Sequence, residues 1–433
     1  MKFEPFIAYR VAFSENKTFT RMIIRIAIVA VALSLSIMII ATALIQGFKK
    51  EISEKVFGFW GHIHITDTYV NRSIEAVPIN MNQAFYNSID SINQIYYTDH
   101  KRFLGYSMTN SEVDRVTKGG VQRIQSFTHL PGIINTKEEI EGIILKGVGL
   151  DFNWSFIQDY LIEGEGLSLV DSVQSNGIII SKQTANRLRL SLEDEFLIHF
   201  VINGNQLKRK FKISGIFKTG LEEYDKQFAI IDMRKIQQLL GWSENQVGGF
   251  EVFVENLDDI DIINEYIYLE ELPANLYAES IRSKFPQIFE WLELQNINEG
   301  TILALMIIVS IINMITALLI LILERTKMIG ILKSLGARDW KIRNIFLIQA
   351  AYIIMIGLFF GNFFGIGICF LQKHFKFITL NEANYYLNVA PIHFDFMTIL
   401  ILNVGTLLII LLTLIIPTYL VSKITPMKSL RFD

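Results

Sequence analysis

The chain reads Glu324-Arg-Thr-Lys-Met-Ile-Gly-Ile-Leu-Lys-Ser-Leu-Gly-Ala-Arg-Asp-Trp-Lys-Ile-Arg343 between two apolar runs, at 301–323 and 344–371. Each run is long enough to cross a bilayer, because about 20 apolar residues span the hydrocarbon core. The segment between them is basic and amphipathic, with four apolar residues at helical spacing: Met328, Ile331, Leu332 and Leu335. We therefore predict a short surface helix that ends at Gly336, with Asp339 capping the helix that follows.

Composition indicates a membrane protein. The 433 residues are 51% hydrophobic and have a mean hydropathy of +0.35, which is high for a soluble chain of this length. Four segments are predicted as transmembrane helices, at 22–46, 299–323, 344–371 and 396–421. Residues 47–298 have the mixed composition of a water-soluble domain. The predicted fold class is an α-helical membrane protein with four transmembrane helices and a large α+β extracytoplasmic domain inserted between the first and second spans.

The distribution of basic residues predicts the orientation in the membrane. Lysine and arginine gather in 1–21, 324–343 and 422–433, whereas the loop 372–395 carries only two lysines, which two acidic residues balance. Because basic loops stay on the cytoplasmic side, both termini and the segment 324–343 are predicted to be cytoplasmic. Residues 1–21 are expected to form an amphipathic helix at the membrane surface and 422–433 a cytoplasmic tail. The domain at 47–298 and the loop 372–395 then lie outside.

The outer domain is predicted to be α+β, with strands at 61–66, 176–181, 195–201, 206–217 and 251–254. The turn Asn203-Gly204-Asn205 is a strong hairpin signal. We expect two subdomains, with about 155–250 inserted, and a helix from 286 that continues into the second span. Acidic residues outnumber basic ones in this domain, which argues against nucleic-acid binding. Cys369 is the only cysteine, so the domain has no disulfide.

Small residues recur on two of the predicted spans and indicate close helix packing. On the first span these residues are Ala27, Ala30, Ser34 and Ala41, although ordinary membrane composition is an alternative explanation there. The third span carries Gly357, Gly361 and Gly365, a repeated small-x3-small pattern. The pattern leaves open whether these glycines pack within one chain or between two.

Motifs for catalysis are missing from the sequence. It contains no Gly-x4-Gly-Lys-Ser/Thr, no Gly-x-Ser-x-Gly, no His-Glu-x2-His and no Cys-x2-Cys. His62 and His64 point to the same side of a predicted strand, but without a third ligand we interpret them as packing or surface histidines rather than a metal site. The spans also lack the acidic residues that ion-coupled transport uses. We therefore predict a protein without catalytic residues or metal, driven by energy from elsewhere.

The segment 324–337, with Ile342 and Phe346-Leu-Ile-Gln349, resembles the coupling loop of FtsX-like ABC permeases. The closing stretch 416–431, with its two prolines and Leu430-Arg431, is similar to the end of the same permeases. Parts of the outer domain resemble the lipoprotein-releasing permeases of the LolC/LolE type. The residues concerned are Leu145-Lys-Gly-Val148, Ser181, Ala185, Leu188, Asp194 and Ile216-Phe217. The resemblance extends over essentially the whole chain.

This resemblance implies a permease in a bacterial inner membrane, working by mechanotransmission. Such permeases pair with a second copy or a paralogue, and each grips a separate cytosolic ABC ATPase that binds ATP and Mg, so no cofactor is expected on this chain. The implied ATPase-coupling residues are Glu324, Arg325, Lys327, Met328, Ile331, Leu332, Leu335 and Gly336. The implied cargo is a lipoprotein, lifted from the outer leaflet toward a soluble periplasmic chaperone.

Two departures from the LolC/LolE pattern keep alternatives open. Chaperone-docking subunits carry a longer, proline-bearing hook where this chain has Asn203-Gly204-Asn205, and Glu193 replaces the usual glycine before Asp194. The chain is then a hookless partner or belongs to another export system. The alternatives are an FtsX-like regulator of cell-wall hydrolases, an exporter of a toxin, peptide or macrolide, and a membrane-anchored receptor or scaffold. Cargo identity and pairing with a like or unlike chain stay open.

Overall fold

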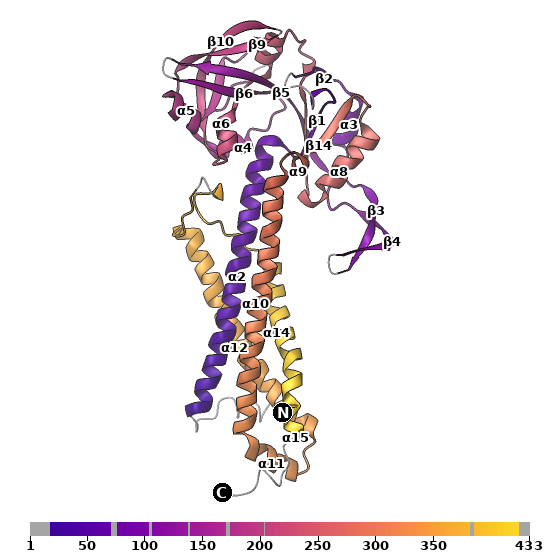
Figure 1. Cartoon of the computed structure of the whole chain (residues 1–433), viewed down its shortest axis with the longest axis vertical. Coiled ribbons are helices and arrows are strands. Elements are labelled where there is room, and N and C mark those ends of the chain that lie inside the picture. Colours follow the sequence, from indigo (N-terminus) through magenta and orange to yellow (C-terminus); the bar gives the residue numbers. More distant parts are fainter. Residues whose placement is uncertain are drawn as a thin grey trace. The chain divides into compact units, whose positions relative to one another are not determined.

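The computed structural model describes residues 18–70, 76–103, 106–136, 139–169, 174–202, 204–381 and 385–423. The chain divides into two compact units (Figure 1). We call the first the membrane unit, made of Met1–Glu51, Glu290–Leu380 and Val389–Asp433. The second, the sheet domain, comprises Ile52–Phe289 and Asn381–Asn388. The amphipathic helix predicted at 1–21 and the tail predicted at 422–433 lie almost entirely outside the described residues.

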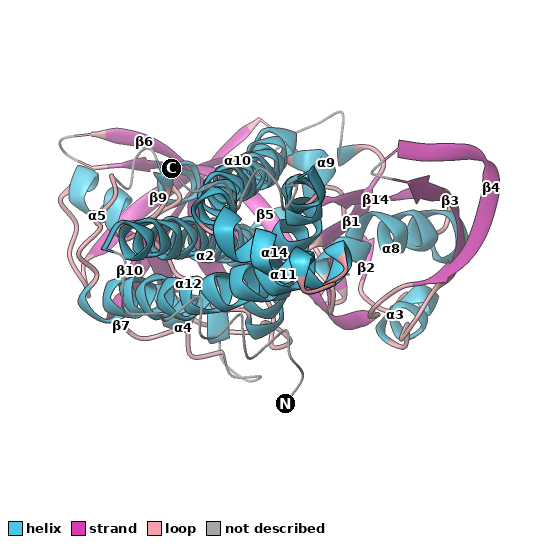
Figure 2. Ribbon diagram, turned by 90° about the horizontal axis from the view of Figure 1, so that it is seen from below, coloured by secondary structure: helices cyan, strands magenta, loops and turns pink. Residues whose placement is uncertain are grey.

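Long helices form the membrane unit, and Figure 2 shows them nearly end-on. Their bounds are α2 Thr18–Trp60, α10 Pro286–Glu324, α11 Thr326–Ser334, α12 Asp339–Phe375, α14 Phe396–Thr418 and α15 Leu420–Lys423. Among the described residues, four stretches are long and apolar enough to cross a membrane: α2, α10, α12, and α14 together with α15. The helix predicted to run from 286 into the second span is confirmed, because α10 is unbroken from Pro286.

The helices of the membrane unit share one apolar core. Its fully buried side chains include Leu35 of α2, Leu321 of α10, Ile354 of α12 and Ile410 of α14. Many other apolar side chains of these helices are exposed, among them Phe359, Phe363 and Phe370 of α12. Large exposed apolar surface on a helix bundle is what a lipid environment accommodates, so this pattern agrees with the sequence-based assignment of the spans.

One ten-stranded mixed sheet organises the sheet domain, with the order β14-β1-β13-β5-β6-β11-β8-β10-β7 and β9 paired to β10 and β5. The strands are β1 Ile63–Asp67, β5 Val121–Asn135, β6 Ile140–Val148, β7 Leu161–Gly164, β8 Gly177–Ser181, β9 Glu195–Ile202, β10 Asn205–Phe217, β11 Phe228–Asp232, β13 Gly249–Val254 and β14 Leu276–Ser280. Two pairs stand apart from this sheet: β2 Ile79–Asn80 with β12 Gln246–Val247, and β3 Tyr96–Phe103 with β4 Tyr106–Val116. Only β10–β8 and β11–β6 pair in parallel within the large sheet.

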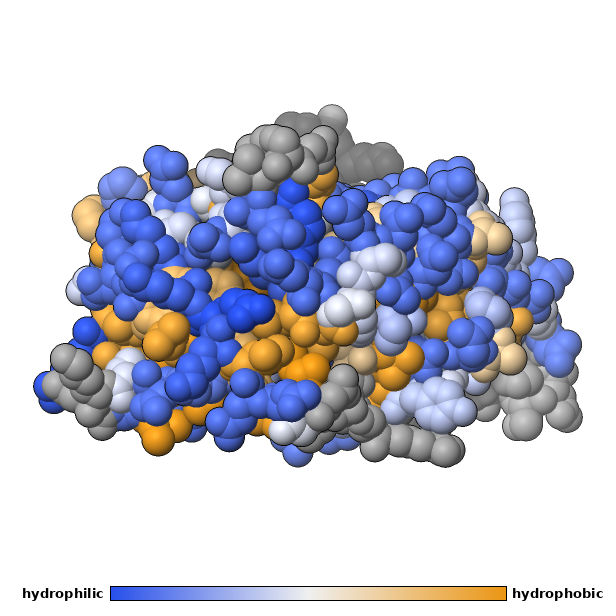
Figure 3. All heavy atoms as spheres, turned by 90° about the horizontal axis from the view of Figure 1, so that it is seen from above, coloured by the Kyte–Doolittle hydropathy of each residue, from blue (hydrophilic) through white to orange (hydrophobic). Residues whose placement is uncertain are grey.

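Short helices flank these strands: α3 Ala84–Asp90, α4 Ser155–Tyr160, α5 Lys182–Leu188, α6 Glu222–Gln227, α7 Met233–Leu240, α8 Ile260–Tyr266 and α9 Ile281–Lys284. Ser181 caps α5 by accepting a hydrogen bond from the Thr184 amide. Figure 3 looks onto the sheet domain, whose surface there is mostly hydrophilic. The predicted α+β character is confirmed.

The hairpin predicted around Gly204 is confirmed. Strands β9 and β10 pair in register from Ile202 opposite Asn205, which leaves a two-residue turn. Gly204 has a φ of +76°, where glycine is favoured, while Asn203 lies outside the described residues. Glu193 also adopts a positive φ, of +71°, a conformation that glycine reaches without steric cost.

Candidate coupling site

The helix predicted in the basic segment is α11, and a glycine ends it. The Ala337 amide donates to the Leu332 carbonyl and the Gly336 amide donates to the Lys333 carbonyl, each at 3.0 Å. Gly336 has a φ of +86°. This pair of hydrogen bonds closing on a left-handed glycine is the Schellman motif, which satisfies carbonyls that the helix itself leaves unpaired. The predicted end of the helix at Gly336 is therefore correct.

The predicted role of Asp339 as a helix cap is wrong. Asp339 is the first residue of α12, the N-cap is Arg338, and no side chain makes a cap hydrogen bond. The Asp339 carboxylate instead pairs with the Lys333 ammonium, Oδ1 to Nζ at 2.9 Å. An acidic residue in the first turn still favours α12 through the helix dipole.

Two basic residues tie this corner together. Lys333 Nζ donates to the Ser422 carbonyl of α15 at 3.2 Å. Arg343 of α12 donates from Nη2 to the Ile415 carbonyl of α14 at 3.3 Å, and its guanidinium lies 5.5 Å from the ring centres of both Trp340 and Tyr419. Because these charges are used internally, α11 and the facing ends of α12, α14 and α15 form one connected corner.

The apolar stripe predicted on α11 divides into two faces. Met328 and Leu332 are half-buried against the core of the membrane unit, and Ile329, which the periodicity argument did not include, is fully buried. Ile331 and Leu335 are 49% and 79% exposed, and Trp340, at the start of α12, is 57% exposed. The surface free to meet a partner is therefore Ile331, Leu335 and Trp340, which we call the corner patch. Trp340 could have been found from the sequence, as the one aromatic residue in the basic segment.

The remaining predicted coupling residues surround this patch. Glu324 ends α10 and is half-buried. Arg325, between α10 and α11, is also half-buried, and its Nε has no hydrogen-bond partner among the described residues. Lys327 and Gly336 are exposed. The structure thus brings the predicted set together at one corner, with an exposed cation beside exposed apolar groups.

The glycines predicted for helix packing belong to α12 and pack against α2 of the same chain. A Cβ added at Gly357 would come within 2.8 Å of Val31 Cβ, and one at Gly361 within 2.9 Å of Leu35 Cβ. At Gly365 it would come within 3.2 Å of Ile39 Cβ. Ser36 Oγ also donates to the Gly361 carbonyl at 2.9 Å.

The small residues of the first span are placed unevenly. Ala27 and Ser34 are buried, while Ala30 and Ala41 are only half-buried. The glycines face Val31, Leu35 and Ile39 instead, so branched residues of α2 fill the space that the glycines open. The packing of the glycines is thus within the chain.

Polar pairs inside the membrane unit were missed by sequence reasoning. Asn362 of α12 and Asn403 of α14 donate to each other's side-chain oxygens, at 2.7 and 3.0 Å. Gln349 of α12 is fully buried, and neither of its amide atoms has a partner among the described residues. Isolated polar residues within apolar runs are the signal that could have identified them.

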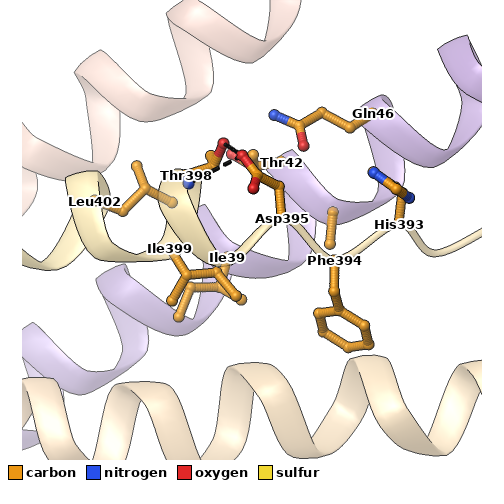
Figure 4. A pocket seen from close by; sticks show the side chains of 10 residues that line it. Ile39, Thr42, Gln46, His393, Phe394, Asp395, Thr398, Ile399 and Leu402 are labelled. Carbon is orange, nitrogen blue, oxygen red and sulfur yellow. Dashed lines mark hydrogen bonds between the residues drawn. The ribbon is translucent and has the colours of Figure 1, made fainter.

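A narrow pocket lies between α2 and the start of α14 (Figure 4). Ile39, Thr42 and Gln46 line it from α2, while Asp395 and Leu402 are among those on the other side. Asp395 caps α14, accepting from the Thr398 hydroxyl and from the Met397 and Thr398 amides; these hydrogen bonds lower the pKa of its carboxyl. The cavity volume, ≈ 10 Å³, leaves room for about one water molecule, so it is too small for cargo.

The two histidines of β1 and its approach are buried in the sheet domain. His62 Nδ1 accepts a hydrogen bond from the Val254 amide at 2.7 Å, and burial together with the charge of Arg123 lowers its pKa to about 3. Burial also lowers the pKa of His64, whose Nε2 contacts the Trp60 carbonyl. Both rings are therefore neutral packing groups. Among the described residues, no cluster of three or more metal-ligand side chains occurs.

Comparison with known proteins gives a consistent picture. Residues 300–426 match the family model described as FtsX-like permease C-terminal. The chain is 23% identical over 421 residues to the lipoprotein-releasing system transmembrane protein LolC of Buchnera aphidicola subsp. Schizaphis graminum (strain Sg), covering 95% of this chain and 94% of that protein.

Two further relatives extend this result. LolC of Xylella fastidiosa (strain Temecula1 / ATCC 700964) is 20% identical, with 94% of this chain and 93% of that protein covered. The transmembrane protein LolE of Haemophilus influenzae (strain ATCC 51907 / DSM 11121 / KW20 / Rd) is 18% identical, with 98% of each covered. The resemblance to FtsX-like permeases of the LolC/LolE type is confirmed. The four long apolar helices of the described residues agree with a multi-pass membrane protein.

Proposed function

We propose that this FtsX-like chain is the permease subunit of an ATP-driven ABC transporter that extracts lipoproteins from a bacterial inner membrane for delivery to the outer membrane. The relatives that match over nearly the full length are named as lipoprotein-releasing system transmembrane proteins. The chain itself has no nucleotide-binding motif, so ATP and Mg are bound by a separate ATPase subunit. In this arrangement the chain is not an enzyme.

The main structural support for coupling to an ATPase is the corner patch. Ile331, Leu335 and Trp340 are exposed apolar side chains, and the exposed ammonium of Lys327 lies on the same short helix. An aromatic and aliphatic anchor with a neighbouring cation suits an apolar groove with an acidic rim on the ATPase. Met328 and Leu332, which are half-buried, support α11 from behind.

The proposed orientation in the membrane determines the direction in which movement would be transmitted, from the cytoplasmic ATPase to the outer domain. The basic residues of 1–21, 324–343 and 422–433 support a cytoplasmic location for α11 and both termini. The sheet domain, whose surface in Figure 3 is mostly hydrophilic, would then lie in the periplasm. ATP-driven closure of the ATPase would move the corner patch and the helices attached to it. This transmission to the outer domain is the mechanotransmission mode.

The proposed assembly pairs this permease with a second permease, either a copy or a paralogue. The turn of the β9–β10 hairpin has only two residues, so the hairpin carries no extended loop at its tip. We therefore assign this chain the role of the hookless partner, and direct capture of a periplasmic chaperone to the other permease of the pair.

A substitution in the corner patch tests the proposal. Leu335→Asp should abolish co-purification of the ATPase, because truncating a buried anchor costs about 2 kcal/mol or more and a buried charge adds to that loss. The side chain is exposed, so membrane insertion and folding should be unchanged. Leu150→Asp is the matched control, because Leu150 is also exposed but lies in the sheet domain. Normal recovery of the ATPase with Leu335→Asp would show that the corner patch does not couple.

A further inference from the structure

The last turn of α2 ends inside the sheet domain, at Trp60. A helix leaves its final carbonyl groups without partners from its own backbone. Here Gly61, with a φ of +72°, turns the chain, and its amide donates to the Phe57 carbonyl at 2.7 Å. The carbonyls of Phe59 and Trp60 still require donors, and these come from outside the helix.

Side chains from two strands supply these donors. Lys146 of β6 donates from Nζ to the Phe59 carbonyl at 2.5 Å, and the Nε2 atom of His64 on β1 bonds to the Trp60 carbonyl. A cation at the carbonyl end of a helix is also favoured by the helix dipole. The end of α2 is therefore held by the sheet through specific polar contacts as well as by packing.

A third strand completes the group. Glu251 of β13 pairs with Lys146, Oε1 to Nζ at 2.6 Å, and accepts from Gln125 Nε2 at 2.8 Å. Lys146 and Glu251 are 1% and 0% exposed. Burial alone raises the pKa of Glu251, but Lys146 and His64 outweigh that effect and lower it to about 2, so the carboxylate is charged at neutral pH.

Aromatic rings seal this group from water. The Phe59 ring centre lies 5.1 Å from Lys146 Nζ. The Trp60 ring packs against Phe228 and Phe285, with ring centres 5.0 and 5.6 Å apart. In a site without water each polar contact is stronger and the geometry is better defined.

A buried ion pair adds little stability over well-packed apolar residues of similar volume, so stability alone does not account for it. The pair and the neighbouring His64 are distinguished by their position. The three residues come from three different strands, and Lys146 and His64 both bond to the end of α2. We propose that Lys146, Glu251 and His64 form a joint that fixes the last turn of α2 to strands β1, β6 and β13. Its use in passing movement of α2 to the sheet rests on the proposed function; the fixation itself does not.

The test uses the full-length chain with its ATPase in lipid nanodiscs. The double variant Lys146→Met/Glu251→Gln removes both charges together and so leaves no buried unpaired ion. We expect amide hydrogen exchange across 57–64 to rise at least 10-fold, with exchange in β8 and α5 unchanged. ATP hydrolysis should persist, while lipoprotein release falls at least 10-fold.

The matched control is Arg234→Met/Asp232→Asn, which neutralises another ion pair of the same sheet. In that pair Nη2 and Oδ2 are 2.6 Å apart and Asp232 is buried, but the pair lies at the start of α7. It should leave exchange at 57–64 unchanged. Lys146→Arg keeps a cation, so amide exchange at 57–64 should be slower in this variant than in the double variant.

Two results would overturn the joint. One is unchanged exchange at 57–64 in the double variant. The other is an equal rise in exchange throughout the sheet domain, which would mean that the pair supports the whole fold and not this connection. Failure of the wild-type chain to release lipoprotein would count against the proposed function only, because the exchange measurement does not depend on transport.

Discussion

At the scale of single residues, burial decides the chemistry of the sheet domain. His62 and His64 are buried and His129 is half-buried, and desolvation lowers the pKa of all three rings. The charges of Arg123 at His62 and of Lys146 at His129 lower it further. These rings therefore stay neutral in the folded chain at pH values where an unfolded histidine takes up a proton.

This predicts a stability that depends on pH. The folded pKa of each histidine lies below the unfolded value of about 6.5, so the unfolded state binds more protons as pH falls. The contribution is complete above about pH 6.5 and is lost as pH falls toward the folded value, about 3 for His62. In thermal unfolding of the purified chain, Tm should change little from pH 7.5 to about 6.5 and should decrease from there to pH 5.

His129→Phe isolates one of these groups. The His129 ring packs beside Phe127 and Trp60, and its Nε2 atom has no hydrogen-bond partner among the described residues. A phenylalanine fits such surroundings and cannot be protonated, so the Tm of this variant should fall less steeply between pH 6.5 and 5. An identical slope in the variant and the wild-type chain would contradict the assignment of His129 as a group that stays neutral in the folded chain.

A second prediction concerns the glycines of α12. Gly361→Val should destabilise the membrane unit by about 1–3 kcal/mol, the usual cost of overpacking, because its Cβ would meet Leu35. Gly367→Val is the control on the same helix, since nothing lies within 4 Å of a Cβ added there. Thermal unfolding in detergent compares the two; equal Tm values would show that α12 and α2 are not in close contact.

At the scale of elements, α11 shows what periodicity can and cannot provide. The spacing of apolar residues and Gly336 correctly predicted a short helix and its end. The same spacing did not predict which part of the apolar face packs inward, because these residues form one broad arc that extends from Ile331 to Ile329. Contacts with α12, α14 and α15 decide this, and they bury Ile329 while exposing Ile331.

The free energy of unfolding distinguishes the residue of α11 that packs inward, Ile329, from the neighbouring exposed residue, Ile331. Ile329→Ala should lower the free energy of unfolding by about 2–5 kcal/mol, as expected when a fully buried isoleucine is truncated. Ile331→Ala should change it by less than about 0.5 kcal/mol, because half of that side chain is exposed. Denaturation of the detergent-solubilised chain measures both, and a reversed order would contradict the inward face assigned to α11.

Less of the sheet than of the helices could be predicted from the sequence. The β9–β10 hairpin could be predicted because its two strands are joined by a recognisable turn. The order of the ten strands could not, since β1 pairs with β13 and β14 from the far end of the domain. For the same reason Lys146 could be noticed in the sequence, but its partner Glu251 could not.

At the scale of the whole molecule, composition was sufficient for the general organisation. Four apolar stretches and one α+β region could be predicted because lipid requires long apolar helices and water does not. The polar contacts that connect elements, such as Asn362 with Asn403, required the structure. Lipoprotein extraction by this layout is the central proposal.

Depletion of the chain in its own cells tests that proposal most directly. The measured quantity is the fraction of a newly made outer-membrane lipoprotein that stays in the inner membrane. We predict that this fraction rises on depletion, and that a plasmid copy with Leu150→Asp restores sorting whereas one with Leu335→Asp does not. Normal sorting of lipoproteins in depleted cells would contradict it.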